Sequence, residues 1–191
     1  MSNLEYFLDK EFSNIDLGKE GFSPGEYENC KFEKCNFSKV KLSECVFINC
    51  EFINCDLTSS NISASVFRDV KFDTCNLVGL PFDNCNQLLL SFAFTGCVLN
   101  RASFFRMKMQ KTEFIKCEMA DVDFGMTDLT GASFNECDLR NAAFDNSNLS
   151  KCDFRKAYNY SIDPENNKIA KAKFSTIGLS GLLAKYDIVI E

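Results

Sequence analysis

The eleven cysteines are the residues of this chain best suited to chemistry, since thiolates bind zinc and form disulfide bonds. Their positions indicate a different role. Each cysteine lies two residues before the apolar position of a five-residue repeat, a position that Gln87 fills after Cys85. The position of the cysteines is otherwise filled largely by Ala, Ser, Thr or Val. Zinc sites often include histidine, which this chain lacks. We therefore expect reduced, inward-facing thiols that only fill space, with no metal and no cofactor, in a cytoplasmic protein.

Carboxylates are the second group that could act chemically, because acids outnumber bases in residues 113–153. The acids expected to contact a partner each directly precede an apolar repeat residue, which predicts that they face water: Glu113, Glu118, Asp123, Asp128 and Asp138. Glu118 and Asp138 are twenty residues apart and should lie one above the other. Such a like-charge pair lowers the stability of the fold, so its presence favours a role for the two acids in binding a partner. The alternative is structural, since an Asp side chain at this position can hydrogen-bond the nearby backbone.

Catalysis is not expected. The chain has no histidine for general-base work, no G-x-S-x-G motif and no phosphate-binding glycine loop. Its paired carboxylates are predicted to lie on a convex, regular surface instead of in a pocket. We therefore interpret the protein as a binding protein and not an enzyme.

The element that must position these residues is the repeat itself. From Phe12 to Phe82, and again from Phe94 to Phe154, every fifth residue is apolar without exception. A period of five is neither the 3.6 of a helix nor the 2.0 of a strand. Short, fixed self-similarity of this kind indicates a solenoid, in which each repeat buries its apolar residue by stacking on its neighbours.

Residues 132–156 read ASFNE, CDLRN, AAFDN, SNLSK and CDFRK, which resembles the pentapeptide-repeat family. The resemblance covers roughly residues 7 to 157. It implies an all-β, right-handed, four-sided β-helix with four pentapeptides in each coil. Residues twenty apart should then stack at about 4.8 Å, giving about seven coils and a rod about 35 Å long. Columns of phenylalanine should line two opposite walls.

The repeat shifts by two positions within residues 84–93. Gln87 occupies a core position there, and Leu88, Leu89 and Leu90 follow no repeat. Two residues must therefore bulge out of one coil. We expect the leucines to fold back over the coil; the alternative is a loop that contacts a partner.

The two ends should act as caps, because a bare coil exposes its core and strand edges. At the start, residues 1–11 form the expected cap, with apolar residues that can cover the first coil: Leu4, Tyr6, Phe7 and Leu8. The repeat domain then spans residues 12–157.

Residues 158–191 form the expected C-terminal region, which begins with a turn-rich crossing segment. Ser175 is predicted to cap a short amphipathic α-helix that ends at Lys185 or Tyr186, followed by a strand-like segment over residues 187–191. The residues expected to form a dimer contact are Leu179, Leu182, Leu183, Tyr186 and Ile188, with Ile190 beside them. This surface exceeds what a plain cap needs, which favours a homodimer.

Within the family, the chain is similar to the quinolone-resistance and microcin-immunity proteins in its length and in the segments at 160–169 and 181–190. That resemblance implies an end-to-end homodimer that mimics DNA. Its partner would be a type II topoisomerase, DNA gyrase or topoisomerase IV, which it inhibits, modulates or protects, with possible quinolone resistance. An acidic surface of this kind excludes direct nucleic-acid binding, and no segment is apolar enough to enter a membrane. The alternative is a scaffold for another macromolecule.

Overall fold

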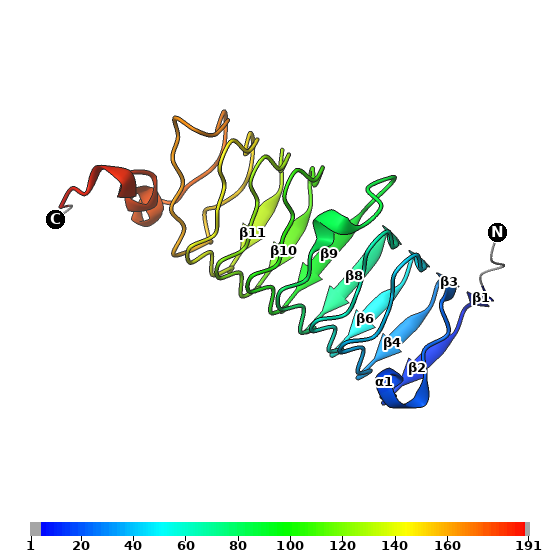
Figure 1. Cartoon of the computed structure of the whole chain (residues 1–191). Helices are drawn as coiled ribbons and strands as arrows, with labels where there is room; N and C mark the ends of the chain where they lie inside the picture. The colour runs from blue at the N-terminus through cyan, green and yellow to red at the C-terminus, as the bar shows by residue number, and fades with distance from the viewer. Residues whose placement is uncertain (1–4, 190–191) are drawn as a thin grey trace. The chain divides into compact units, whose positions relative to one another are not determined.

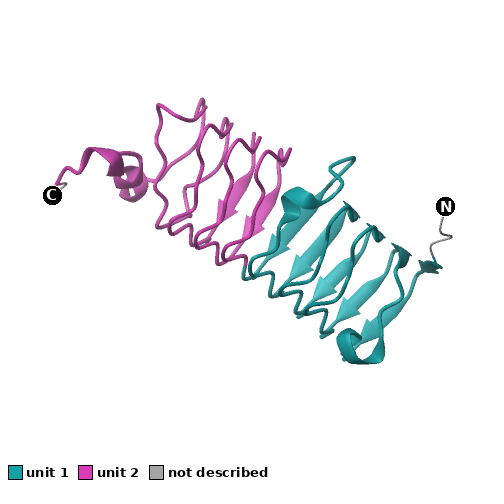
Figure 2. Ribbon diagram, in the orientation of Figure 1, with its two compact units in different colours: residues 1–98 teal, residues 99–191 magenta. Residues whose placement is uncertain are grey.

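Parallel strands related by twenty residues build the protein (Figure 1). The computed structural model describes residues 5–189; Leu4 of the expected N-terminal cap and Ile190 of the expected dimer contact lie outside them. The chain divides into two compact units, residues 1–98 and 99–191, shown in different colours in Figure 2. Each unit is a β-solenoid, which confirms the fold class. No helix among the described residues is long and apolar enough to cross a membrane.

The N-terminal unit has two walls of paired strands. The first wall consists, in order, of β1 (Glu5–Leu8), β3 (Gly25–Glu28), β5 (Val46–Ile48) and β7 (Val66–Arg68). The second consists of β2 (Glu11–Ser13), β4 (Lys31–Glu33), β6 (Glu51–Ile53), β8 (Val70–Asp73) and β9 (Phe92–Thr95). A short helix, α1 (Leu17–Glu20), and one turn of 3-10 helix, η1 (Phe82–Asn84), complete the unit.

The C-terminal unit has one strand pair, β10 (Glu113–Ile115) and β11 (Ser133–Asn135), with Phe114 opposite Phe134. Its remaining walls are held by single bridges between residues twenty apart, such as Asp123 with Ala143. Two 3-10 helices, η2 (Ile177–Leu182) and η3 (Ala184–Tyr186), follow the last coil.

The core of each coil is a stack of aromatic rings. In the C-terminal unit Phe134 lies parallel to Phe114 at 5.0 Å and to Phe154 at 4.9 Å between ring centroids. A second column contains Phe104, Phe124 and Phe144, with centroids 5.2 and 5.3 Å apart. All of these rings are buried, as the repeat predicts.

The eleven cysteines are all buried and none forms a disulfide bond, which confirms that they face inward. The structure adds a polar role that the sequence analysis missed. The thiol of Cys152 donates to the carbonyl of Leu129 at 2.9 Å, and Ser147 donates to the carbonyl of Phe124 at 2.6 Å in the same way. The inward position therefore suits a small residue with a hydrogen-bond donor, which explains why Cys, Ser and Thr share it.

The corners of the coils use left-handed backbone. Lys111, Lys151 and Lys171 have φ values of 60°, 62° and 61°, and many equivalent residues are similar. Left-handed backbone is unfavourable for residues other than glycine. This conformation is stabilised because the backbone N–H groups of many corner residues donate hydrogen bonds to carbonyls of the next coil. Lys151, for example, donates to the carbonyl of Ala170 at 2.9 Å.

The two-residue shift lies between residues 86 and 92. Val66 still pairs with Asn86, twenty residues on, whereas Val70 pairs with Phe92, twenty-two residues on. Phe92 enters the core there and is 7% exposed. Leu88 and Leu89 are 70% and 62% exposed, so the expectation that they fold back over the coil is wrong. The reason is local: the side chain of Asn86 accepts the N–H of Leu88, and Leu89 adopts left-handed backbone, which turns the chain outward.

The N-terminal segment is part of the first coil instead of a separate cover. β1 pairs with β3, and Phe7 stacks on Tyr27 at 4.6 Å. Tyr6 and Leu8 are 54% and 43% exposed, so they do not cover the core as expected. The cause is the strand alternation, which points neighbours of an inward residue outward.

The coil continues past residue 157, where the sequence analysis ended it. Asn148 pairs with Lys168 and Asp153 with Lys173. Phe174 stacks on Phe154 at 5.3 Å, although two of the three intervening five-step positions are Asn159 and Pro164. Buried Tyr160 and Ile162 supply the missing apolar volume in this coil.

The expected C-terminal α-helix is wrong, because residues 177–186 form two 3-10 helices separated at Leu183. The hydroxyl of Ser175 does accept the N–H of Gly178 at 3.1 Å, as a helix cap would. The carbonyl of Gly181, however, accepts the N–H of Ile162 at 2.9 Å, a bond to the preceding coil. No strand follows over residues 187–189.

Candidate protein-interaction surfaces

The acidic residues of the C-terminal unit are divided among all four sides of the coil. We name each side by one outward residue. The 118 side carries Glu118, Asp138 and Tyr158, and the 123 side carries Ser103, Asp123 and Ala143. The 108 side carries Lys108, Asp128, Asn148 and Lys168, and the 113 side carries Glu113, Ser133, Asp153 and Lys173.

The five acids predicted to contact a partner therefore do not form one face. Only Glu118 and Asp138 are stacked in paired positions, as expected from their spacing. Glu113 and Asp128 lie on two other sides, because each step of five residues moves the chain to the next side of the coil. The acids on the adjacent 118 and 123 sides, Glu118, Asp123 and Asp138, remain together as one candidate acidic surface.

The aspartates have structural roles in the local backbone. Asp123 accepts the N–H of Gly125 at 2.8 Å, and Asp128 accepts the N–H of Thr130 at 3.1 Å. Partial burial raises the pKa of Asp128, but hydrogen bonds from Thr130 and Gln110 outweigh this and hold the pKa below its ordinary value. The structural alternative left open by the sequence therefore applies to these aspartates, although it does not exclude contact with a partner.

Asp138 is the most strongly engaged of the five acids. Arg140 approaches one carboxylate oxygen at 2.7 Å, and the amide of Asn159 donates to the other at 2.8 Å. Partial burial raises the pKa of Asp138, but the hydrogen bonds from Asn159 and Arg140 outweigh this and hold the pKa below its ordinary value.

Glu118 and Glu113 differ from the aspartates. Both side chains are exposed, and within residues 5–189 neither forms a side-chain hydrogen bond or an ion pair. Neither glutamate side chain therefore contributes a hydrogen bond or an ion pair to the described structure, unlike the aspartates at equivalent positions. Glu118 is therefore the acid on the candidate acidic surface that is most available to a partner.

The C-terminal segment is held against the last coil by close contact with Tyr160. A Cβ atom on Gly181 would lie 2.3 Å from the carbonyl oxygen of Tyr160, and one on Gly178 would overlap its hydroxyl. The glycines that weaken a helix in the sequence thus permit this contact.

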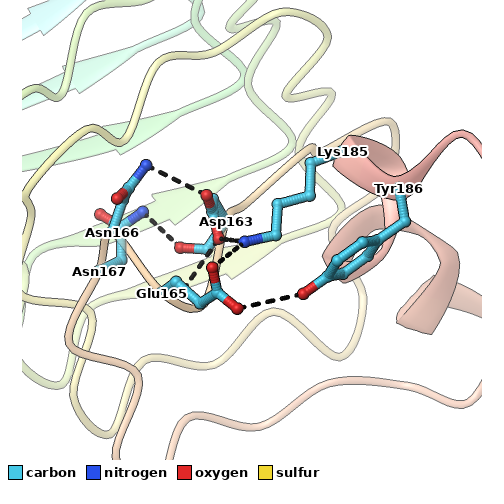
Figure 3. A network of polar contacts seen from close by, with 6 residues as sticks. All are labelled: Asp163, Glu165, Asn166, Asn167, Lys185 and Tyr186. Carbon is cyan, nitrogen blue, oxygen red and sulfur yellow. Dashed lines mark hydrogen bonds and ion pairs between the residues drawn. The ribbon is translucent and has the colours of Figure 1, made fainter.

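Ion pairs and hydrogen bonds connect η3 to the turn at residues 163–167 (Figure 3). The ammonium of Lys185 lies between Asp163, at 2.8 Å, and Glu165, at 2.6 Å. Tyr186 donates to Glu165 at 3.2 Å. Lys185 lowers the pKa of both carboxyls, and they in turn raise the pKa of Lys185. We call this group the Lys185 clasp.

The expected dimer contact is largely exposed. Leu179, Leu183, Tyr186 and Ile188 are 45%, 37%, 53% and 55% exposed, while Leu182 is half-buried. Two further residues that the sequence analysis did not include, Ile177 and Val189, are 92% and 86% exposed. Both residues are apolar, so hydropathy alone could have indicated them. The helical pattern does not select them, because Ile177 does not share the i, i+3, i+4, i+7 spacing of the predicted helix and Val189 lies beyond its end. We call Ile177, Leu179, Leu183, Tyr186, Ile188 and Val189 the terminal apolar surface.

In the N-terminal unit, the bulge carries Gln87, Leu88, Leu89 and Leu90, the residues of the alternative contact loop. Its end is fixed by Ser91, whose N–H donates to the carbonyl of Phe67 at 3.1 Å and whose hydroxyl donates to Asp69 at 3.0 Å. Gln87 is exposed and Leu90 is half-buried. The loop therefore presents two leucines on a fixed base.

A family model described as the pentapeptide repeat region matches this chain over residues 22–92, 47–124 and 89–158. The chain is a pentapeptide-repeat protein. No curated protein matches it by sequence.

Solved structures agree with the fold of this pentapeptide-repeat protein. It is similar to a trypsin-treated form of QnrB1, a plasmid-mediated fluoroquinolone resistance protein, with a TM-score of 0.76 at 17% identity over 98% of this chain and 92% of that one. It is also similar to HetL, a pentapeptide-repeat protein involved in heterocyst differentiation regulation from the cyanobacterium Nostoc sp. strain PCC 7120. That comparison gives a TM-score of 0.58 at 15% identity over 89% of this chain and 86% of HetL.

Proposed function

We propose that this pentapeptide-repeat protein binds a type II topoisomerase, DNA gyrase or topoisomerase IV, as a DNA mimic and modulates or protects it. The acidic surface of the 118 and 123 sides supports this proposal most directly. Glu118 and Asp138 are stacked on consecutive coils, and Glu118 is exposed without a partner in the described part of the chain. Repeated carboxylates on a rigid β scaffold resemble a row of phosphates in charge.

The proposal includes a homodimer formed through the terminal apolar surface. Exposed apolar groups gathered at one segment mark protein contacts. A two-fold dimer would present two copies of the acidic surface, which suits the two-fold DNA-binding site of a topoisomerase. We place the protein in the cytoplasm and assign it no catalytic role; eleven buried cysteines without a disulfide bond support a reducing compartment.

The decisive experiment is a gyrase supercoiling assay with and without a fluoroquinolone, together with competition against DNA for gyrase binding. Because the Glu118 side chain forms no hydrogen bond or ion pair within residues 5–189, E118K changes charge without removing a side-chain bond. We expect E118K to slow association, and E118K/D138K to slow it further. The control is E26K/E44K in the N-terminal unit, which reverses two acids that form no ion pair among the described residues.

Binding should weaken steeply with salt, because exposed charges are screened over about 8 Å at physiological ionic strength. If the intact protein neither binds gyrase at low salt nor competes with DNA, the mimicry proposal is overturned.

The second candidate function is a scaffold that binds a different macromolecule. The projecting Leu88 and Leu89 favour it, because DNA mimicry makes no use of exposed leucines. Pull-down with purified protein should then recover a partner whose binding is lost in L88S/L89S and retained in E118K.

A further inference from the structure

The 108 side of the C-terminal unit is basic, although the protein carries a formal net charge of −6. Lys108 and Lys168 lie on one bridged column with Asp128 and Asn148 between them. The corner beside this column carries Lys111, Gly131, Lys151 and Lys171, joined coil to coil by backbone hydrogen bonds. We call Lys108, Lys111, Lys151, Lys168 and Lys171 the lysine side.

The five lysines are exposed, and none forms an ion pair or side-chain hydrogen bond within residues 5–189. Several other cations of the unit are paired with acids: Arg140 with Asp138, Arg155 with Asp153, and Lys185 with the two acids of its clasp. Asp128, the acid within the lysine side, is already bonded to Gln110 and Thr130. Asp128 offsets one of the five lysine charges, and the charge of Lys108 helps to lower the pKa of Asp128. The lysine side therefore keeps a net positive charge of four.

The coil geometry places these charges at regular heights. Lys151 and Lys171 occupy consecutive coils, about 4.8 Å apart, and Lys111 lies two coils before Lys151, about 10 Å away. Bringing like charges this close is unfavourable. Their repulsion is relieved when an anion lies along the column, and lysine stems are long enough to adjust to it.

We propose that the lysine side binds an extended acidic segment, rich in Asp and Glu, of a protein partner. Alternate side chains of an extended segment recur about every 7 Å on one face, so two or three carboxylates can reach the lysines together.

An acidic peptide fits this side better than nucleic acid. A duplex is wide enough to reach the adjoining sides, where Asp123, Glu113 and Asp153 would repel its phosphates. The lysine side also contributes no aromatic residue on which unpaired bases could stack. A narrow peptide avoids the neighbouring acids. This surface is separate from the acidic surface and from the terminal apolar surface, so its role does not depend on topoisomerase binding.

The test is fluorescence anisotropy of the full-length protein with a labelled peptide of alternating Glu and Ser, at about 50 mM salt. The variant is K151E/K171E. Its matched control is K34E/K39E, which changes the net charge equally at corners with the same left-handed backbone, φ 53° and 61°. Glutamate is tolerated at such corners, since Glu44 and Glu136 occupy them with φ 64° and 58°.

We expect K151E/K171E to bind the peptide about tenfold more weakly or worse, and the control to change affinity by less than about twofold. Circular dichroism and denaturation midpoints should match among the three proteins. No peptide binding by the unaltered protein, or equal loss in both variants, would overturn the proposal. Tighter binding to a single-stranded or duplex oligonucleotide than to the peptide would overturn it in favour of nucleic acid.

Discussion

The amide N–H of Ile162 donates to the carbonyl oxygen of Gly181 at 2.9 Å and joins the last coil to the segment that follows it. In an α-helix that carbonyl would instead accept the N–H of Lys185. The tertiary bond competes with the helical one, and the segment adopts 3-10 turns. Exposed Ile177, Leu179 and Tyr186 therefore lie in 3-10 helices and not on one face of an α-helix.

Replacing Gly181 by Ala should detach this segment, because its Cβ would lie 2.3 Å from the carbonyl oxygen of Tyr160. We expect faster hydrogen exchange at the amide of Ile162, with little change at Phe134 in the core. S180A, at an exposed neighbour, is the control. Unchanged exchange at Ile162 in G181A would contradict the contact.

The Lys185 clasp predicts a pH dependence. Because Lys185 lowers the pKa of Asp163 and Glu165, their pairing stabilises the attached segment above the ordinary carboxyl pKa of about 4. That contribution is lost as the pH falls through the two lowered values. Limited proteolysis after residue 175 should therefore become faster at acidic pH with an acid-stable protease. K185M should be cleaved faster than the unaltered protein at neutral pH, with a smaller dependence on pH.

Replacing Phe134 by Ala should cost about 3–5 kcal/mol of unfolding free energy, because stacked coils on both sides prevent the site from collapsing. Its ring lies parallel to those of Phe114 and Phe154. Urea denaturation followed by circular dichroism measures the loss. F134L, which keeps most of the buried volume, should cost much less; an equal cost for both would argue against the stack.

The inward hydroxyl of Ser147 predicts a ranking of substitutions. S147C should be tolerated, since cysteine donates to the same carbonyl position elsewhere in the chain, as in Cys152. S147V should cost about 1–3 kcal/mol or more, because it leaves the carbonyl of Phe124 without this donor and adds volume to a tight position. Equal denaturation midpoints for the two variants would contradict the hydrogen-bonding role.

Replacing Leu88 and Leu89 by Ser should leave stability within about 0.5 kcal/mol, because both side chains are exposed. By contrast, F92S should destabilise the N-terminal unit strongly, since Phe92 fills the core after the bulge. Thermal denaturation of the two variants separates these outcomes. A large loss in L88S/L89S would indicate that the leucines cover the coil after all.

Much of the fold is determined locally by the sequence. Inward positions recur every five residues, so Phe114, Phe134 and Cys152 could be placed in the core from spacing alone. The stacking of Glu118 on Asp138 also follows from their twenty-residue separation. These predictions hold because each coil repeats the same backbone and needs no distant partner to define its inward side.

The candidate surfaces depend on tertiary structure. The acidic run of residues 113–153 passes around all four sides of the coil, so Asp128 lies on the lysine side and not beside Glu118. Leu88 is exposed because Asn86 turns the chain outward, and the carbonyl of Gly181 bonds Ile162 instead of its own helix. The sequence by itself determined which residues of the repeat are buried, through a short period, although not Phe92, Tyr160 or Ile162 outside it. Only the tertiary structure decided which exposed residues share a side and how the last segment ends, because both depend on groups that are distant along the chain.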